Sequence, residues 1–387
     1  MAIDLNFGPE HDSFRAEVRS FLAREWHDGR DVAEFRRAAT DAGYFYRSVP
    51  RRFGGSEQAP DSVRLSIIAT EFARAKAPGE LKGNGIQMLV PTLLECGEEW
   101  QREMFIPRTL TGEFQWAQGY SEPGSGSDLA SLRTRGELVD GKWVINGQKV
   151  WTSYARQCRY MFALVRTEPD APKHEGISYL ILDLHQPGVD IRPMKQINGG
   201  NDFNEVFFDN ATTPADWIVG ERGKGWSVSK STLKHERNML GGIDRSEAMF
   251  NSLVKLVQRT TLDGTEASKV PWVRERLAGL KAELEMQRHS SHIQIARALS
   301  GGDAGLLQMM GKLVQSNFAA SVAGLATQLI EDDALLSPIG NRRPGNERWV
   351  GQYMNSLAAA IAGGTSNIQR NIIAERGLGL PREKGGA

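Results

Sequence analysis

The N-terminal part of the chain, up to about residue 110, has the hydrophobic spacing of amphipathic helices. In the segment FRAEVRSFLARE, the apolar residues Phe14, Val18, Phe21 and Leu22 recur at intervals that place side chains on one face of an α-helix. Glycine and proline interrupt similar patterns that continue to residue 96. We therefore predict further helices over about 31–43, 61–77 and 85–96.

The pattern changes near Gly112 to short runs rich in β-branched and aromatic residues, which continue to about Gly225. Two pairs of turn residues, Asp140-Gly141 and Asn146-Gly147, lie between such runs, and each pair predicts a tight hairpin. The runs that follow, YMFALVRT, ISYLILDL, VDIRPM and NEVFFDNA, are each bounded by turn residues. This spacing is typical of an antiparallel β-sandwich or barrel rather than of alternating strands and helices.

Helical spacing resumes at Trp226. We predict helices over about 226–259, 271–300, 303–331, 347–361 and 365–376. The chain is thus predicted to be an α+β multidomain protein. An N-terminal helical domain (1–112) precedes a central antiparallel β-sandwich or barrel domain (113–225), and a C-terminal helical bundle (226–387) follows.

The charge balance excludes several classes of partner. The 387 residues include 47 Lys and Arg against 47 Asp and Glu, so there is no electrostatic reason to bind nucleic acid or an anionic membrane. No apolar run is long enough to span a bilayer, and the first residues lack the pattern of a secretory leader. Two cysteines, Cys96 and Cys158, form no CxxC pair, which fits a reducing compartment. We therefore expect a cytoplasmic enzyme.

Common nucleotide and metal motifs are absent from the sequence. It has neither a G-x-G-x-x-G fingerprint nor a GxxxxGKS/T loop, so a bound nucleotide would be held in another way. His289 and His292 lie three residues apart on a predicted helix and could share a metal ion. Neither a carboxylate nor a cysteine is placed to complete such a site. We therefore predict no metal and interpret the pair as part of a solvated helix face.

Two polar segments in the predicted β domain could bind a ligand. Residues 120–128, Tyr-Ser-Glu-Pro-Gly-Ser-Gly-Ser-Asp, offer hydroxyls and backbone N–H groups, which suit a polar planar ring or a phosphate. Residues 149–153, Lys-Val-Trp-Thr-Ser, include Trp151, which could belong to a core or form a platform against which a ring stacks. Taken alone, the first segment is better explained as an ordinary polar turn, and the second does not decide between its two roles.

Five motifs in this order resemble the acyl-CoA dehydrogenase family over nearly the whole chain. They are YSEPGSGSDLA, NGQKVWTS, RGKGW, LKHER and GGTSNIQR. The resemblance implies an FAD-dependent enzyme that binds an acyl-CoA thioester against the flavin, between the β domain and the C-terminal helices. It also implies electron transfer to an electron-transferring flavoprotein, assembly as a homodimer or homotetramer, and a place in fatty acid and lipid catabolism.

The resemblance assigns roles to residues of the matched motifs. The residues implied to line the flavin are Gln118, Ser121, Trp151 and Ser153. Among these, the two serines would form hydrogen bonds to the isoalloxazine edge, and the tryptophan would cover the flavin face from which electrons leave. Ser127 is implied to contact the CoA part of the ligand, and Thr365 and Asn367 match positions that contact the adenine dinucleotide part of FAD.

The implied reaction removes a proton from the α carbon and a hydride from the β carbon of the thioester, the hydride going to flavin N5. An α proton is weakly acidic, so the site needs a carboxylate base and donors for the thioester oxygen. The family's usual base position is Gly363 here, whose backbone N–H can still donate to that oxygen, together with an FAD ribityl hydroxyl. A minority of the family, including isovaleryl-CoA and long-chain enzymes, places the base at the position of Glu236.

We therefore predict that Glu236 is the base and that Arg237 orients the loop carrying Gly363 and contacts the substrate. The alternative is that Glu236 and Arg237 form an ordinary solvated pair on a helix. Glycines at 241–242 and 363–364 leave space, which favours a branched, cyclic or bulky acyl group unless they serve helix packing or capping.

Two segments depart from the family pattern. An Arg-x-x-Phe-Gly segment expected near 259–264 is Arg-Thr-Thr-Leu-Asp-Gly here, and a Gln-x-x-Gly-Gly segment expected near 328–333 is Gln-Leu-Ile-Glu-Asp-Asp. In the family both lie where FAD is shared between subunits. Three hypotheses therefore stand: an active FAD-dependent acyl-CoA dehydrogenase, which we prefer; a subunit that needs a second dehydrogenase chain in a heteromer; and a flavin-dependent monooxygenase or oxidase on the same fold.

Overall fold

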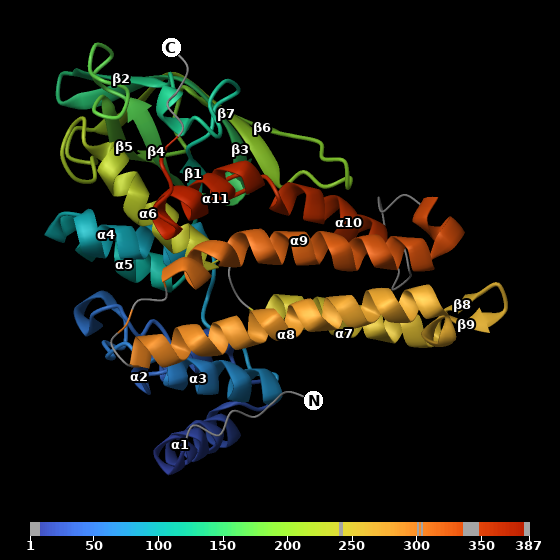
Figure 1. Cartoon of the computed structure of the whole chain (residues 1–387). Helices are drawn as coiled ribbons and strands as arrows, with labels where there is room; N and C mark the ends of the chain where they lie inside the picture. Colours follow the sequence, from blue (N-terminus) through green and yellow to red (C-terminus); the bar gives the residue numbers. More distant parts are fainter. Residues whose placement is uncertain (1–7, 240–242, 300–301, 303–304, 336–347, 383–387) are drawn as a thin grey trace. The chain divides into compact units, whose positions relative to one another are not determined.

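The computed structural model describes residues 8–239, 243–299, 302, 305–335 and 348–382, without the side chains of residues 10, 236–239, 298 and 299. The chain separates into two compact units. The first comprises residues 1–192 and 204–235, and the second comprises residues 193–203 and 236–387. The predicted order of helical, β and helical parts is confirmed (Figure 1). The domain boundaries at residues 112 and 225 stay predictions.

The first unit opens with helices that match the predicted apolar spacing. They are α1 (Pro9–Glu25), α2 (Val32–Asp41), α3 (Ser62–Arg74), α4 (Val90–Cys96) and α5 (Glu99–Leu110). The face predicted for the first helix is buried, because Phe14, Val18, Phe21 and Leu22 are all at most 6% exposed. These side chains therefore join α1 to the core of the unit.

Local capping explains where several of these helices begin. The side chains of Asp31 and Asp61 accept hydrogen bonds from the backbone N–H groups three residues further on, at the starts of α2 and α3. The sequence pattern does not predict α5, because its many charged residues obscure a narrow apolar face. That helix begins with a capping box, in which the Glu98 backbone N–H donates to the Gln101 side chain.

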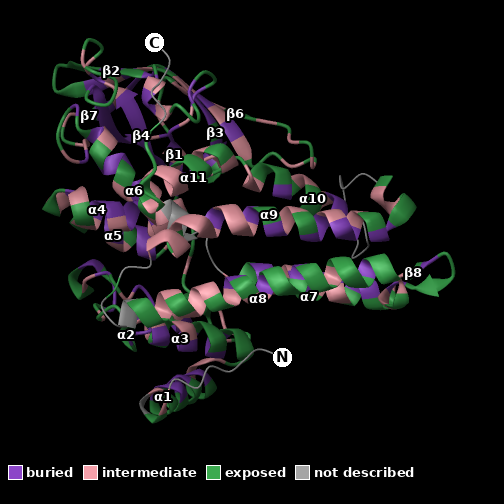
Figure 2. Ribbon diagram, in the orientation of Figure 1, coloured by how far each residue is buried: buried purple, intermediate pink, exposed green. Residues whose placement is uncertain are grey.

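A seven-stranded sheet follows the helices. Its strands are β1 (Trp116–Gly119), β2 (Arg135–Val139), β3 (Lys142–Ser153), β4 (Tyr160–Arg166), β5 (Ile177–Asp183), β6 (Val189–Pro193) and β7 (Phe203–Pro214). The strand order is β1-β4-β2-β3-β7-β6, and β5 pairs with β4. Both β4 and β5 are buried along their length except for the last residue, so they form the centre of the sheet's core (Figure 2).

The sheet is mixed, whereas the spacing of the apolar runs predicts an antiparallel one. Strand β4 runs parallel to β1 and, where they meet, to β2, but antiparallel to β5. A parallel neighbour needs a long connection, and the segment that contains β2 and β3 supplies it between β1 and β4. The lengths of the runs do not reveal which strands become neighbours.

The predicted hairpin at Asp140-Gly141 is confirmed. These residues connect β2 to β3, with Val139 paired to Lys142. Their φ angles are 48° and 74°, which is the left-handed turn that an Asp-Gly pair favours.

The prediction of a second hairpin at Asn146-Gly147 is wrong. Both residues lie inside β3, where Asn146 pairs with Arg135 of β2. A Cβ atom at residue 147 would lie 2.6 Å from the hydroxyl oxygen of Thr134. The glycine therefore permits a close approach of two chain segments and does not form a turn.

Helices α7 (Ile243–Arg259), α8 (Pro271–Leu299), α9 (Gly305–Leu329), α10 (Arg348–Ala359) and α11 (Ser366–Ile372) make up most of the second unit. The single helix predicted over 226–259 is instead α6 (Gly225–Met239) followed by α7, with the glycine pair 241–242 between them outside the described residues. The core includes Phe250, Leu253, Leu280, Phe318 and Trp349 from four helices. In the described part of the chain, no helix is both long and apolar enough to cross a membrane.

Candidate active site

The polar segment 120–128 folds into a closed loop after β1. Glu122 and Ser125 exchange backbone hydrogen bonds of 2.9 and 3.0 Å. The Ser125 hydroxyl donates to the carbonyl of Asp128 at 2.9 Å, which fixes the far side of the loop. This arrangement leaves Ser121 half-buried and Ser127 exposed to solvent.

A buried ion pair joins this loop to the end of β3. The Lys149 ammonium lies 2.8 Å from a carboxylate oxygen of Glu122 and also donates to the carbonyl of Tyr120 at 3.2 Å. Lys149 is fully buried, and Glu122 is 8% exposed. The backbone N–H of Val150 donates to the carbonyl of Ser121 at 2.9 Å. The two segments singled out in the sequence are therefore held together.

The same ion pair lowers the pKa of the Glu122 carboxyl. Burial alone would raise the pKa of Glu122, but the Lys149 charge and hydrogen bonds from Lys149, Arg133 and Thr134 outweigh it and hold that pKa below its usual value. Sequence reasoning assigned no role to either partner. The available signal was a lysine at a position of β3 that the strand alternation buries.

Trp151 combines an exposed ring with a strained backbone. Its side chain is 58% exposed, although most of β3 around it is buried. Its φ of 61° lies in the left-handed region, which costs a bulky residue about 1–3 kcal/mol. The Asn204 amide holds the next peptide by donating to the carbonyl of Thr152 at 2.9 Å. Half-buried Ser153 follows on β3, and Gln118 lies half-buried on β1, which packs against β3.

In the second unit, the turn before α11 carries two glycines in the left-handed region. Gly363 has a φ of 64° and Gly364 a φ of 93°. The buried Lys312 ammonium donates to the carbonyl of Gly364 at 2.7 Å and to that of Ala360 at 3.3 Å. The Gln369 amide donates to the carbonyl of Gly363 at 3.0 Å. Among the described residues, the N–H of Gly363 has no acceptor, so it can bind an oxygen of a ligand.

The remaining predicted residues of the second unit lie at two helix ends. Thr365 caps α11 by accepting a hydrogen bond from the N–H of Ile368 at 3.3 Å. Asn367 is exposed on the same helix. Glu236 and Arg237 lie in the last turn of α6, but their side chains are outside the described residues.

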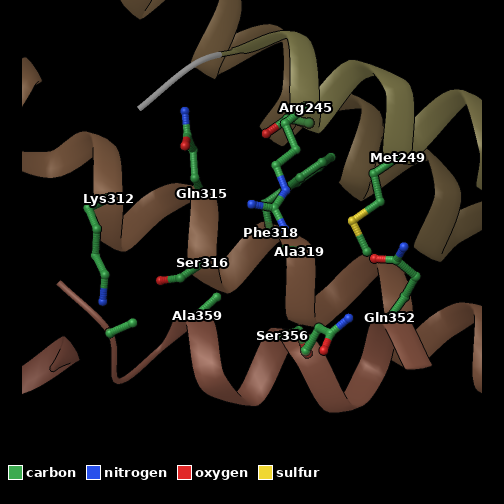
Figure 3. A pocket seen from close by; sticks show the side chains of 13 residues that line it. Arg245, Met249, Lys312, Gln315, Ser316, Phe318, Ala319, Gln352, Ser356 and Ala359 are labelled. Carbon is green, nitrogen blue, oxygen red and sulfur yellow. The ribbon is translucent and has the colours of Figure 1, made fainter. Parts of the chain in front are cut away.

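A pocket opens in the second unit between α7, α9 and α10 (Figure 3). Its lining contains two cations, three amides, three hydroxyls and five apolar side chains, but no carboxylate among the described residues. Ala362, the residue before Gly363, belongs to this lining. The pocket therefore begins beside the turn with the free N–H.

The histidine pair predicted to be a solvated helix face lies on α8. The rings of His289 and His292 have centroids 6.1 Å apart. Within the described ranges, no group of three or more His, Cys, Asp and Glu residues could hold a metal ion.

Family models match three consecutive parts of the chain. The acyl-CoA dehydrogenase N-terminal domain matches residues 8–113. The acyl-CoA dehydrogenase middle domain matches residues 117–211, and the acyl-CoA dehydrogenase C-terminal domain matches residues 223–378.

Individual relatives match over nearly the full length. The protein named acyl-CoA dehydrogenase IpdE1 of Mycobacterium tuberculosis is 37% identical over 399 residues, which cover 97% of this chain and 99% of the relative. The crystal structure of the ChsE4-ChsE5 complex from Mycobacterium tuberculosis is similar with a TM-score of 0.77 and 26% identity, over 98% of this chain and 100% of that one. The Tcur3481-Tcur3483 steroid ACAD gives the same TM-score of 0.77, with 26% identity over 98% and 100% of the two chains.

Proposed function

The chain belongs to the acyl-CoA dehydrogenase family and is an oxidoreductase acting on acyl-CoA, and from this premise we propose the role of each site residue in the reaction. The proposed reaction removes a proton from the α carbon and a hydride from the β carbon of an acyl-CoA thioester. The cofactor is FAD, and the reduced enzyme passes its electrons to an electron-transferring flavoprotein. The observation that carries the proposal is the turn at Gly363, which offers a free N–H but no carboxylate.

The residues of the first unit suit a flavin ring. Trp151 presents an aromatic face to solvent, and the half-buried serines at 121 and 153 belong to the same two joined segments. Strained backbone is retained where the surroundings impose it, and it is concentrated at ligand sites, which supports a binding role for Trp151. Gln118 completes the proposed flavin contacts, and Ser127 is the proposed CoA contact. Bound FAD supplies the acceptor for the hydride.

The second unit supplies the acid–base part of the proposal. Glu236 takes the α proton, and the N–H of Gly363 donates to the thioester oxygen as negative charge develops there. Lys312 and Gln369 hold the carbonyls of the turn, so that the N–H direction is set before the substrate arrives. Arg237 orients the same turn and contacts the substrate. Thr365 and Asn367 are the proposed contacts of the adenine dinucleotide part.

The test begins with the chain expressed alone. Its visible absorption spectrum gives the flavin bound per chain, and anaerobic mixing with acyl-CoAs then gives the rate of flavin reduction. We expect Glu236→Gln to keep flavin and ligand binding but to slow reduction at least about a thousandfold. Glu283→Gln, which changes an exposed carboxylate on α8, is the matched control and should reduce at the wild-type rate. Near-normal reduction in the Glu236 variant would remove this residue from the mechanism.

A second candidate function is that of a subunit in a heteromeric dehydrogenase. The names of both similar structures contain two different proteins. In this chain, the segment 259–264 runs from the last residue of α7 through the two-residue strand β8 (Thr261–Leu262) to the turn at 263–264, which precedes the paired strand β9 (Thr265–Glu266). The segment 328–333 ends in Glu331, Asp332 and Asp333, whose negative charge would repel the phosphates of a shared FAD. A colourless chain that stays empty after FAD is added, but gains flavin with a partner chain, would favour this candidate.

The acyl group is proposed to be cyclic or bulky. The glycines at 363 and 364 add no side chain beside the pocket, and one of the similar structures is named a steroid ACAD. A panel of acyl-CoAs in which short straight chains give the highest kcat/KM would contradict this part of the proposal. It would leave the dehydrogenase reaction itself intact.

A further inference from the structure

The pocket in the second unit extends away from the turn at Gly363 along two helices. Lys312, which holds the turn, and Ala319 both line it, and they lie seven residues apart on α9, or about 10 Å. Gln352 and Ala359 line it with the same spacing on α10. An acyl group whose thioester oxygen meets the Gly363 N–H would therefore extend past the alanines toward the far end of the pocket.

Most polar groups of the pocket already have partners. The hydroxyls of Ser316 and Ser356 donate to carbonyls of their own helices, at 3.1 and 2.6 Å. The Ser246 hydroxyl donates to the side-chain oxygen of Gln287 at 2.9 Å. The Asn355 amide oxygen accepts a hydrogen bond from Asn198 at 2.8 Å. These groups therefore shape the pocket but offer a ligand few new hydrogen bonds.

Three side chains of the pocket remain without a partner among the described residues. They are the guanidinium of Arg245 and the amide of Gln352, both exposed to solvent, and the half-buried amide of Gln315. Figure 3 shows Arg245 reaching from α7 toward α9, with Gln315 of α9 on one side of it and Gln352 of α10 on the other, beside Met249. Arg245 makes no ion pair with any described carboxylate, and the pocket lining contains none. A guanidinium only donates hydrogen bonds, so its ligand must present acceptor oxygens.

Apolar side chains lie beside these donors. Met249 of α7 and Phe318 and Ala319 of α9 line the pocket together with Arg245. A carbon skeleton can pack on them while a polar end meets the guanidinium, which is the usual composition of a small-molecule pocket. A purely hydrocarbon acyl group would instead displace water from the parts of these groups that face the pocket and offer no acceptor in return.

We infer that this pocket binds the far end of the acyl group, that this end carries a ketone or carboxylate oxygen, and that Arg245 is the residue that recognises it. The inference rests on the proposed function and deepens it by naming the substrate class. Arg245 acts on specificity only, because in the proposed function the thioester oxygen meets the Gly363 N–H at the other end of the pocket. A carboxylate can accept two parallel hydrogen bonds from a guanidinium, one on each oxygen, whereas a ketone has a single acceptor oxygen. Arg245 is therefore expected to raise kcat/KM more for a carboxylate than for a ketone.

The test compares acyl-CoAs of one carbon skeleton that end in a carboxylate, a ketone or a methyl group. The flavin-loaded enzyme is expected to prefer the oxygenated compounds by about 10- to 100-fold in kcat/KM. Arg245→Met should remove this preference, and Arg245→Lys should retain part of it. Lys255→Met, which removes another exposed cation of the same helix that does not line the pocket, should keep the wild-type preference.

Binding without turnover keeps the two proposals separate. Calorimetric titration with the corresponding 2,3-enoyl-CoA products should give the same preference in Kd, again lost in Arg245→Met. If all three acyl-CoAs reduce the flavin with equal kcat/KM, or if Arg245→Met lowers kcat/KM by the same factor for all three, the inference is wrong. The proposed dehydrogenase function then still stands. If none reduces the flavin, the proposed function fails, and the Kd comparison by itself decides the inference. Equal Kd values for the three products would overturn it.

Discussion

The ammonium group of Lys149 lies 2.8 Å from a carboxylate oxygen of Glu122, a residue 27 positions earlier in the sequence. This contact joins two segments of the first unit. One segment is the serine- and glycine-rich loop, and the other carries Trp151 at the end of β3. The pair is buried, and its residues stand directly after Ser121 and two positions before Trp151 in the sequence. It is therefore a positioning device, and its removal should affect stability and flavin binding together.

Breaking the pair on one side should be more damaging than replacing both partners. Lys149→Met leaves a buried carboxylate without its cation, so we expect the free energy of unfolding to fall by about 3–5 kcal/mol. The double variant Glu122→Gln with Lys149→Met should recover part of this loss, because no unpaired charge stays buried and the amide oxygen still accepts from one of the N–H groups of Arg133 and Thr134, which reach different carboxylate oxygens in the wild type. Urea denaturation and the flavin content of each purified variant measure the effect. A single variant within about 1 kcal/mol of wild type would contradict the argument.

The same carboxylate predicts a pH dependence with a defined sign. The pKa of Glu122 is lower in the folded chain than the ordinary value of about 4.3 expected after unfolding. The unfolded state therefore binds the proton first as the pH falls, so the contribution of Glu122 to stability is complete above about pH 5 and is lost as the pH falls through the folded pKa. Compared with Glu122→Gln, the wild type should lose its advantage in denaturation midpoint below pH 4. An advantage of equal size at pH 7 and pH 3.5 would refute this.

Trp151 and Tyr154 form a natural matched pair for testing the flavin platform. Both are more than half exposed, and both have a left-handed backbone, with φ of 61° and 55°. Replacing either by glycine should relieve similar strain and leave the free energy of unfolding equal or higher by about 1 kcal/mol. Only Trp151→Gly should weaken FAD binding, about 2- to 10-fold, through the lost ring contact. Equal FAD affinities in the two variants, measured by fluorescence titration, would remove Trp151 from the proposed site.

Lys312 should influence catalysis through the turn that it holds. In Lys312→Met the carbonyls of Ala360 and Gly364 lose their buried donor, at an expected cost of about 1–3 kcal/mol in unfolding free energy. The Gly363 N–H is then no longer held toward the thioester oxygen, so kcat for flavin reduction should fall more than KM changes. Lys312→Arg, which retains a donor, should rescue part of kcat. A variant that only lowers the denaturation midpoint, with kcat unchanged, would show a structural role alone.

Much of the fold follows from local sequence features. The apolar face of α1 is set by residues within a few turns of one another, and the Asp140-Gly141 turn by the conformations that its two residues adopt readily. The family motifs are also contiguous stretches, so they are recognisable without a fold. Helix α5 is one exception, because its charged residues mask the apolar positions on which the pattern depends.

The candidate site shows where local reasoning ends. The sequence identifies Trp151, but not that its ring is exposed, since a strained φ at one residue is imposed by the strand pairing around it. The Asn146-Gly147 pair has the composition of a turn, yet the neighbouring Thr134 requires a glycine inside a strand. In both cases the deciding contact comes from a residue distant in the sequence.

The sequence by itself therefore determined the helical, β and helical order and the family, because spacing and motif residues are local properties. Tertiary structure alone decided that β1 and β4 are parallel neighbours, that Lys149 pairs with Glu122, and that Lys312 holds the turn at Gly363. It also placed Arg245 in a pocket whose described lining residues include no carboxylate. These relationships depend on long-range packing, in which desolvation selects the partner of each buried charge, and no local pattern encodes that choice.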